Sequence, residues 1–125
     1  MYTNVMYRME RTKSNGNMQA AGRIDLELLA FLERYANGLI KWDIVTFFAR
    51  NPNTHDTAEN IARYLGRSPQ AVAPELADLA LLGLLHRFRR GERVIYQLTS
   101  DPKLRELTFS FLQESEKGRS DHRSH

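Results

Sequence analysis

The sequence contains no cysteine, which excludes disulfide frameworks, cysteine-ligated zinc, iron–sulfur clusters and thiol nucleophiles. Long apolar runs are also missing: the longest, LALLGLL, is far too short to span a bilayer. Residues 1–23 lack the apolar core of a signal peptide. We therefore expect a cytoplasmic protein that does not enter the membrane.

Patterns that would indicate catalysis or metal binding are absent as well. His55, His86, His122 and His125 include no pair with the spacing of a zinc site or of a catalytic helix. There is no glycine-rich phosphate loop, and no serine, histidine and aspartate follow one another in the context of a hydrolase. We expect no enzyme activity, no catalytic residue, no metal and no cofactor.

Length and composition indicate one domain with two tails. A chain of 125 residues is large enough for one core and too small for two ordinary domains. Residues 1–22 have no apolar periodicity and residues 114–125 have no large apolar side chain, so both are predicted to be flexible tails around a domain at 23–113. The formal charge of +3 is compatible with an acidic partner.

Three helices are predicted in the first half of this domain. Apolar residues recur at helical spacing from Ile24 to Tyr35, and a wide apolar arc over residues 39–52 predicts a buried central helix. A short third helix follows, with Asp56 and Glu59 in the relation of a capping box and Gly66 at its end.

The fourth helix has a good start and an internal proline. Ser68 is a favourable N-cap, Pro69 fits the first helical position, and an apolar face ends at Gly83. Pro74 removes one backbone hydrogen bond from a continuous helix. The alternative is a helix that begins at Pro74, after a separate turn over residues 68–72.

A β-hairpin and a last helix complete the domain. Residues 84–99 form two β-prone runs around Arg90 and Gly91, with alternating apolar residues in the second run. In the segment after the hairpin, either Ser100 or Asp101 caps a helix whose apolar stripe runs from Leu104 to Leu112. The predicted fold is therefore mainly α with a small β-hairpin.

The stretch TAENIARYLGRSPQAVAPELADLALLGLLHRF, with the hairpin after it, resembles the winged helix-turn-helix superfamily, in particular its MarR-like and ArsR-like prokaryotic transcriptional regulators. The resemblance covers roughly residues 38–99. It implies a winged helix-turn-helix with additional N- and C-terminal helices. It also implies a DNA-binding transcriptional regulator, in which the second helix of the motif (about 68–82) enters the major groove and the hairpin, or wing (about 86–97), contacts the backbone or the minor groove.

Carried over by position, the resemblance predicts a double-stranded DNA interface with two parts. The second motif helix offers few base-reading groups, while the wing is rich in arginine. Glu75 and Asp78 would repel phosphate unless a neighbouring arginine neutralises them, a role open to Arg87. The predicted DNA-binding residues are Arg67, Ser68, Gln70, Arg87, Arg89, Arg90 and Arg93.

Two further expectations concern partners. In regulators of this kind the terminal helices pair across a two-fold axis, so the apolar stripes of the outer helices predict a homodimer. Trp42, Phe47 and Phe48 could line a pocket for a small-molecule effector, although core packing explains them better. The alternative function is a winged-helix protein–protein interaction module that does not bind specific DNA sequences.

Overall fold

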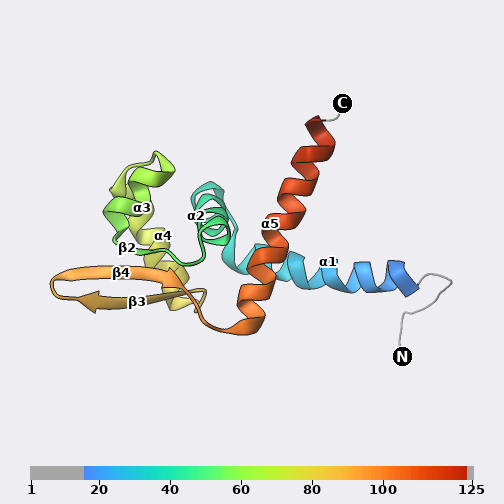
Figure 1. Cartoon of the computed structure of the whole chain (residues 1–125), viewed down its shortest axis with the longest axis horizontal. Coiled ribbons are helices and arrows are strands. Elements are labelled where there is room, and N and C mark those ends of the chain that lie inside the picture. Colours follow the sequence, from blue (N-terminus) through green and yellow to red (C-terminus); the bar gives the residue numbers. More distant parts are fainter. Residues whose placement is uncertain (1–15, 124–125) are drawn as a thin grey trace. The chain divides into compact units, whose positions relative to one another are not determined.

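The computed structural model of the chain describes residues 16–123, and side chains for residues 26–117 within that range. The chain divides into two compact units, residues 1–30 and residues 31–125. The first described helix, α1, crosses this boundary, and the other elements all belong to the second unit (Figure 1). The elements in chain order are α1 (Gly16–Tyr35), α2 (Leu39–Arg50), β2 (His55–Asp56), α3 (Ala58–Leu65), α4 (Pro69–Leu81), β3 (Leu85–Arg90), β4 (Arg93–Leu98) and α5 (Pro102–Arg123).

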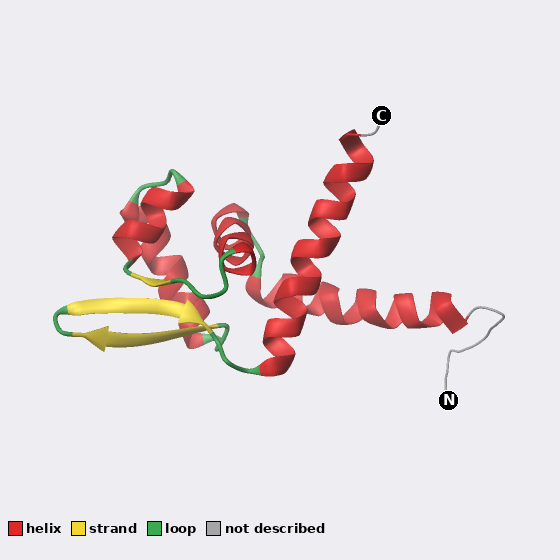
Figure 2. Ribbon diagram, viewed as in Figure 1, coloured by secondary structure: helices red, strands yellow, loops and turns green. Residues whose placement is uncertain are grey.

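The second unit combines helices with a small antiparallel sheet of order β2-β4-β3 (Figure 2). The predicted hairpin is present, with Leu85 opposite Leu98 at its base and Arg90 opposite Arg93 at its tip. Gly91 has a φ of 66° in the turn, a left-handed conformation that favours glycine. Strand β2 was not predicted, because its two residues are too few to show a periodicity.

Helix α3 is capped differently from the prediction. Its N-cap is Thr57, whose hydroxyl accepts a hydrogen bond from the Asn60 amide, and not Asp56. Asp56 lies one residue earlier in β2, where its carboxylate accepts hydrogen bonds from the Thr57 amide and the Asn60 side chain. The N-cap is therefore one residue later than predicted, and the Thr57 amide is bonded by Asp56 and not by the side chain three residues on. The predicted end at Gly66 is confirmed, with a φ of 69°.

Helix α4 is continuous through Pro74, which decides between the two predicted starts. The Ser68 hydroxyl accepts a hydrogen bond from the Ala71 amide, and Pro69 occupies the first turn. Pro74 is exposed to solvent, so its ring does not disturb the buried face of the helix. The helix therefore lacks the backbone hydrogen bond that residue 74 would donate to the Gln70 carbonyl, and this loss lowers its stability.

The core of the second unit joins α2, α3, α4, the hairpin and α5. On α4 the side chains of Val72, Leu76 and Leu79 are completely buried. The other side chains exposed by 1% or less that complete this core are Ile44, Val45, Phe48, Ile61, Ala62, Leu84, Thr108 and Phe111.

Both terminal helices extend further than predicted. Helix α1 begins at Gly16 and α5 continues to Arg123, inside the ranges expected to be tails; residues 1–15 and 124–125 lie outside the described residues. Of the two candidate caps for α5, Asp101 is used, since its carboxylate accepts a hydrogen bond from the Leu104 amide. None of the described helices is long and apolar enough to cross a membrane.

The internal proline generates a stability prediction. Replacing Pro74 with alanine restores an amide donor for the Gln70 carbonyl and should raise the free energy of unfolding by about 2 kcal/mol. Pro69→Ala is the matched control and should change it by less than about 1 kcal/mol, because the first helical turn needs no such donor. Urea unfolding followed by circular dichroism measures both. Equal effects of the two substitutions would contradict the account of Pro74.

Candidate nucleic-acid interface

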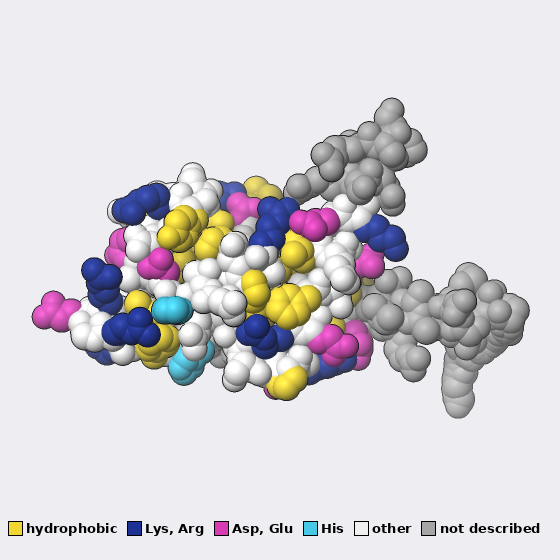
Figure 3. All heavy atoms as spheres, in the orientation of Figure 1, with side chains coloured by type: hydrophobic (Ala, Val, Ile, Leu, Met, Phe, Trp, Pro, Cys, Tyr) yellow, Lys and Arg dark blue, Asp and Glu magenta, His cyan; other side chains and the backbone are white. Residues whose placement is uncertain are grey.

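The hairpin presents four arginines on six-residue strands. Arg87, Arg89 and Arg90 lie on β3 and Arg93 begins β4, and all four are exposed. In Figure 3 several Lys and Arg side chains lie around the free end of the hairpin, together with one acidic side chain at its tip, while others lie over the helices. The two strands hold these cations close together, because Arg90 is paired with Arg93 in the register of the sheet.

The four arginines differ in the contacts that their guanidinium groups make within the protein. The Arg87 guanidinium lies 6.0 Å from the centre of the Tyr96 ring, and that of Arg90 lies 5.5 Å from the centre of the Phe88 ring. The side chains of Arg89 and Arg93 make no hydrogen bond, ion pair or ring contact with any other described residue. Two guanidinium groups are therefore free to meet an anion.

A cleft of about 500 Å³ separates the hairpin from the beginning of α3. Arg87 and Arg93 contribute its cationic wall, and the first turn of α3 contributes Asn60 and the capping residue Thr57. Two acids also line it, one at the hairpin turn and one in the first turn of α3. The complete lining is Thr57, Ala58, Glu59, Asn60, Arg87, Glu92, Arg93, Val94 and Tyr96.

The outward face of α4 begins with polar groups and continues with apolar ones. Ser68 and Gln70, two of the residues predicted to contact DNA, are exposed at its start. The Ser68 hydroxyl is engaged in capping the helix, which leaves the Gln70 amide as the uncommitted hydrogen-bonding group at this end. Farther along, Pro74 and Leu81 are exposed.

The two acids of α4 both pair with one lysine of α2, which the sequence did not predict. Lys41 of α2 donates a 2.5 Å hydrogen bond to Asp78 and lies 3.4 Å from a carboxylate oxygen of Glu75. Arg87, the residue considered for this role, instead lies over Tyr96. The hydrogen bond to Asp78 and the attraction of both carboxylates raise the pKa of the Lys41 ammonium, although burial opposes the rise. Sequence spacing gave no signal for this pairing, since 37 positions separate Lys41 and Asp78.

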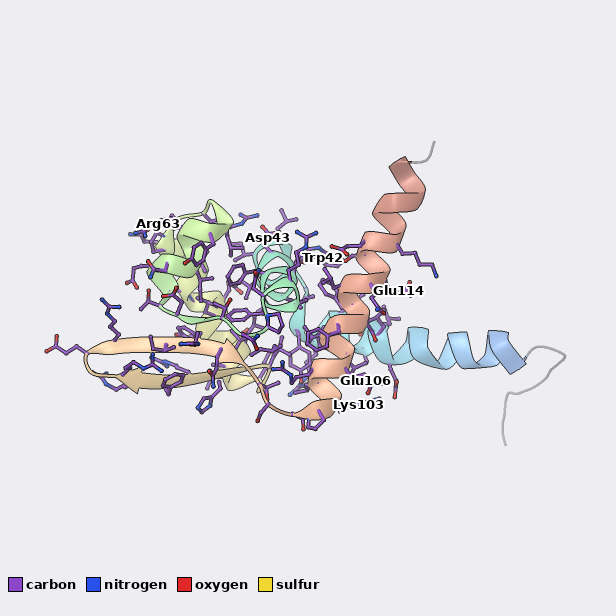
Figure 4. All side chains as sticks on the ribbon, viewed as in Figure 1. Trp42, Asp43, Arg63, Lys103, Glu106 and Glu114 are labelled. Carbon is purple, nitrogen blue, oxygen red and sulfur yellow. The ribbon has the colours of Figure 1, made fainter. Side chains whose placement is uncertain are left out.

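Arg67, which precedes α4, is also engaged. Its guanidinium contacts the Asp43 carboxylate through Nη2 at 2.7 Å and through Nε at 2.8 Å. Figure 4 labels Asp43 on α2, so this contact joins α2 to the turn between α3 and α4. To contact DNA as predicted, the Arg67 guanidinium would have to bind a phosphate while it stays paired with Asp43, or release Asp43 first.

Two surface arginines on α2 and α3 have partners as well. Arg50 pairs with Glu116 of α5 at 3.1 Å, and Arg63 donates a hydrogen bond to the Asn60 side chain within α3. Figure 4 shows Arg63 at the outer side of α3. Arg89 and Arg93 on the hairpin thus differ from Arg50 and Arg63, whose guanidinium groups are already bound to other side chains.

The aromatic residues of α2 serve packing. Phe48 is fully buried, and Trp42 meets Phe111 of α5 edge to face at 4.8 Å between ring centres (Figure 4). Phe47 packs against Phe48 and stacks on Tyr64 of α3 at 5.6 Å. Within the described part of the chain, no three histidine or acidic side chains are grouped to hold a metal ion.

Comparison with solved structures identifies the architecture. A transcription regulator of the Staphylococcus aureus multidrug efflux pump MepA, called MepR, is 20% identical and gives a TM-score of 0.55 over 90% of this chain and 84% of its own. A variant of Lactococcus lactis ZitR is 22% identical, with a TM-score of 0.56 over 84% of this chain and 81% of its own. NadR, solved in complex with 4-hydroxyphenylacetate, is 20% identical and scores 0.53 over 97% and 85%.

This chain has a MarR-type winged-helix fold. The predicted fold class is thereby confirmed: α3 and α4 are the two helices of the helix-turn-helix, and the β3–β4 hairpin is the wing. No protein-family model matches the sequence, and no curated protein matches it significantly.

The Lys41 contacts predict a pH dependence of stability. A lysine whose pKa is raised by folding stabilises the folded state below its unfolded pKa of about 10.4, and this contribution is lost as the pH rises through the folded pKa. At pH 8, Lys41→Met should lower the free energy of unfolding by about 1 kcal/mol. The difference from the unmodified protein should shrink above pH 10.4.

Urea unfolding at a series of alkaline pH values measures this difference. Lys117→Met, which removes an exposed lysine of α5, is the control and should leave stability nearly unchanged at every pH. A difference between unmodified protein and Lys41→Met that stays constant from pH 8 to strongly alkaline solution would refute the assignment of the stabilisation to the Lys41 charge.

Proposed function

We propose that this protein is a DNA-binding transcriptional regulator that holds duplex DNA with the wing and the beginning of α4. The observation that carries the proposal is the pair of free guanidinium groups at Arg89 and Arg93, on a hairpin beside a helix-turn-helix. Arginines that neutralise phosphates release condensed counterions, and this release supplies much of the affinity of proteins for DNA. Arg87 and Arg90 would add to this charge while resting on aromatic rings.

The neutralised acids of α4 support DNA over a protein partner. Unpaired, Glu75 and Asp78 would interrupt a basic surface, which is the arrangement that would have favoured a protein-interaction module. Lys41, which is half-buried, pairs with both carboxylates, so one positive charge partly balances their two negative charges. Phosphate repulsion at this part of α4 is accordingly reduced.

The structural neighbours support the same function. MepR is a transcription regulator, and a variant of it, 20% identical to this chain with a TM-score of 0.52, has been solved bound to an oligodeoxyribonucleotide. If this chain docks on DNA in a comparable way, Gln70 is placed to pair with an adenine edge, and Ser68 and Arg67 lie near the backbone. Base reading would then come from few residues, and the wing would supply most of the affinity.

Salt dependence of binding tests the proposal. Fluorescence anisotropy of a mixed-sequence duplex should give a binding constant that falls steeply with salt concentration. Changing Arg89 and Arg93 together to alanine should weaken binding and reduce the slope of the log–log plot by about 2.

The matched control removes two positive charges elsewhere. Lys103→Ala combined with Lys117→Ala changes the net charge equally but acts on α5, so the slope should stay close to that of the unmodified protein. Absence of binding at low salt, or equal slopes in the two double variants, would overturn the assignment of DNA contact to the wing.

We also propose that the protein acts as a homodimer through its terminal helices. Leu26 and Leu29 on α1 are 69% and 51% exposed, which leaves apolar surface on a helix of the kind that pairs in this fold. Two copies with two-fold symmetry would bind two half-sites, which would increase the phosphate contacts per complex.

Sedimentation equilibrium measures the oligomeric state. The unmodified chain should sediment as a dimer, and Leu26→Glu combined with Leu29→Glu should give a monomer because the paired surface would carry unpartnered charges. Leu39→Glu is the control, since Leu39 is also exposed, at 79%, but lies at the beginning of α2. A dimer that survives the double substitution would place the interface elsewhere.

A further inference from the structure

The outward face of α4 is a stripe of uncharged side chains. Gln70, Ala73, Pro74, Ala77 and Leu81 recur at the spacing that places residues on one side of a helix. Pro74 is exposed and Leu81 is 87% exposed, while Ala73 and Ala77 are half-buried. We refer to these five residues as the outer stripe. They lie opposite the completely buried side chains of Val72, Leu76 and Leu79.

Hydrogen-bonding groups are scarce along the outer stripe. Gln70 supplies its only polar side chain, and α4 contains no lysine, arginine or asparagine. The acids of the helix, Glu75 and Asp78, are bound to Lys41 at one flank of the stripe. A ligand that meets this face therefore finds one amide followed by small apolar surfaces.

We propose that the outer stripe recognises the methyl groups of thymine, so that the protein prefers duplex DNA rich in A·T base pairs. This inference rests on the proposed function, in which α4 enters the major groove. The thymine C5-methyl group projects into that groove and is read by apolar side chains, while glutamine pairs bidentately with adenine. The chemistry of the stripe matches these two features, and the stripe has no arginine or lysine to pair with a guanine edge.

The dimensions of the stripe fit several consecutive base pairs. From Gln70 to Ala77 the helix advances about 10 Å, which corresponds to about three base pairs along the duplex. Alanine side chains at 73 and 77 keep this part of the helix slim, so its backbone can approach the groove floor. Pro74 adds a rigid apolar ring between them and leaves the Gln70 carbonyl without its intrahelical donor.

The surroundings of the stripe indicate a polyanion as the occupant. The chain passes from α4 into the wing within a few residues, and the Leu84 amide bonds the Leu79 carbonyl at 3.0 Å, which fixes the wing beside the helix (Figure 1). The wing carries the free guanidinium groups of Arg89 and Arg93. Apolar surface beside unpaired cations is complementary to a duplex, which presents methyl groups in the groove and phosphates at its edges.

Replacement of thymine by uracil isolates the methyl groups. Short alternating A·T and A·U duplexes have the same phosphates and the same minor-groove edges, and differ in the major groove by the C5-methyl group. The full-length protein should bind the A·T duplex more tightly, by about fourfold for each methyl group that the stripe buries. An alternating G·C duplex that carries 5-methylcytosine should likewise bind more tightly than the unmethylated one.

Matched alanine substitutions locate the effect on α4. Ala73→Ser with Ala77→Ser should bring the ratio of the A·T and A·U affinities close to one, because the hydroxyls put polar atoms against the methyl groups. Ala71→Ser makes the same chemical change on the flank of Glu75 and Asp78, about 120° or more around the helix from Ala73 and Ala77, and should leave the ratio as in the unmodified protein. Thermal unfolding confirms that the variants remain folded.

The possible failures are distinguishable. Salt-dependent binding with equal affinity for the A·T and A·U duplexes would overturn methyl recognition and leave DNA binding intact. A methyl preference that survives Ala73→Ser with Ala77→Ser would also overturn the assignment to the stripe. Absence of binding to every duplex at low salt would overturn the proposed function and, with it, this inference.

Discussion

Burial of one face of α4 is the constraint on which the rest of the interface depends. Val72, Leu76 and Leu79 are completely excluded from solvent, which fixes the rotation of the helix about its own axis. Rotation by even one residue position, about 100°, would expose part of this apolar face and bury Gln70 or Pro74. The residues that α4 presents to a partner are therefore set by what it must hide.

Electrostatic pairing separates structural cations from available ones. Lys41 of α2 pairs with Glu75 and Asp78 of α4. Arg67, in the turn before α4, pairs with an acid of α2, so both cations help to fix α4 against α2. Arg89 and Arg93 lie on the hairpin, and no acidic side chain among residues 26–117 pairs with them. The net charge of the chain does not show which cations are paired and which are unpaired. Binding of a polyanion depends on the positions of the unpaired ones.

Helix boundaries were predicted well from sequence where a residue is favourable at one position of a helix and at few others. Ser68 and Pro69 indicated one of the two starts that the sequence left open for α4, because a hydroxyl cap and a missing amide are both favourable there, and the continuous helix selects that start. The cap of α3 was displaced by one residue, since Asp56 and Thr57 are both good caps and only the position of β2 selects between them. The lengths of α1 and α5 were underestimated because polar residues are compatible with a helix as well as with a tail.

The sequence by itself determined the order of the helices and the hairpin, the winged-helix fold, the apolar residues that α4 buries and the concentration of arginines in the hairpin. These properties follow from the spacing of neighbouring residues, which local geometry converts into faces and turns. Tertiary structure alone decided that Lys41, and not Arg87, pairs with Asp78 and Glu75, and that Arg67 is bound to Asp43. The physical reason is that an ion pair depends on distance in space, and residues far apart in the chain come within a few ångströms only after the core has formed.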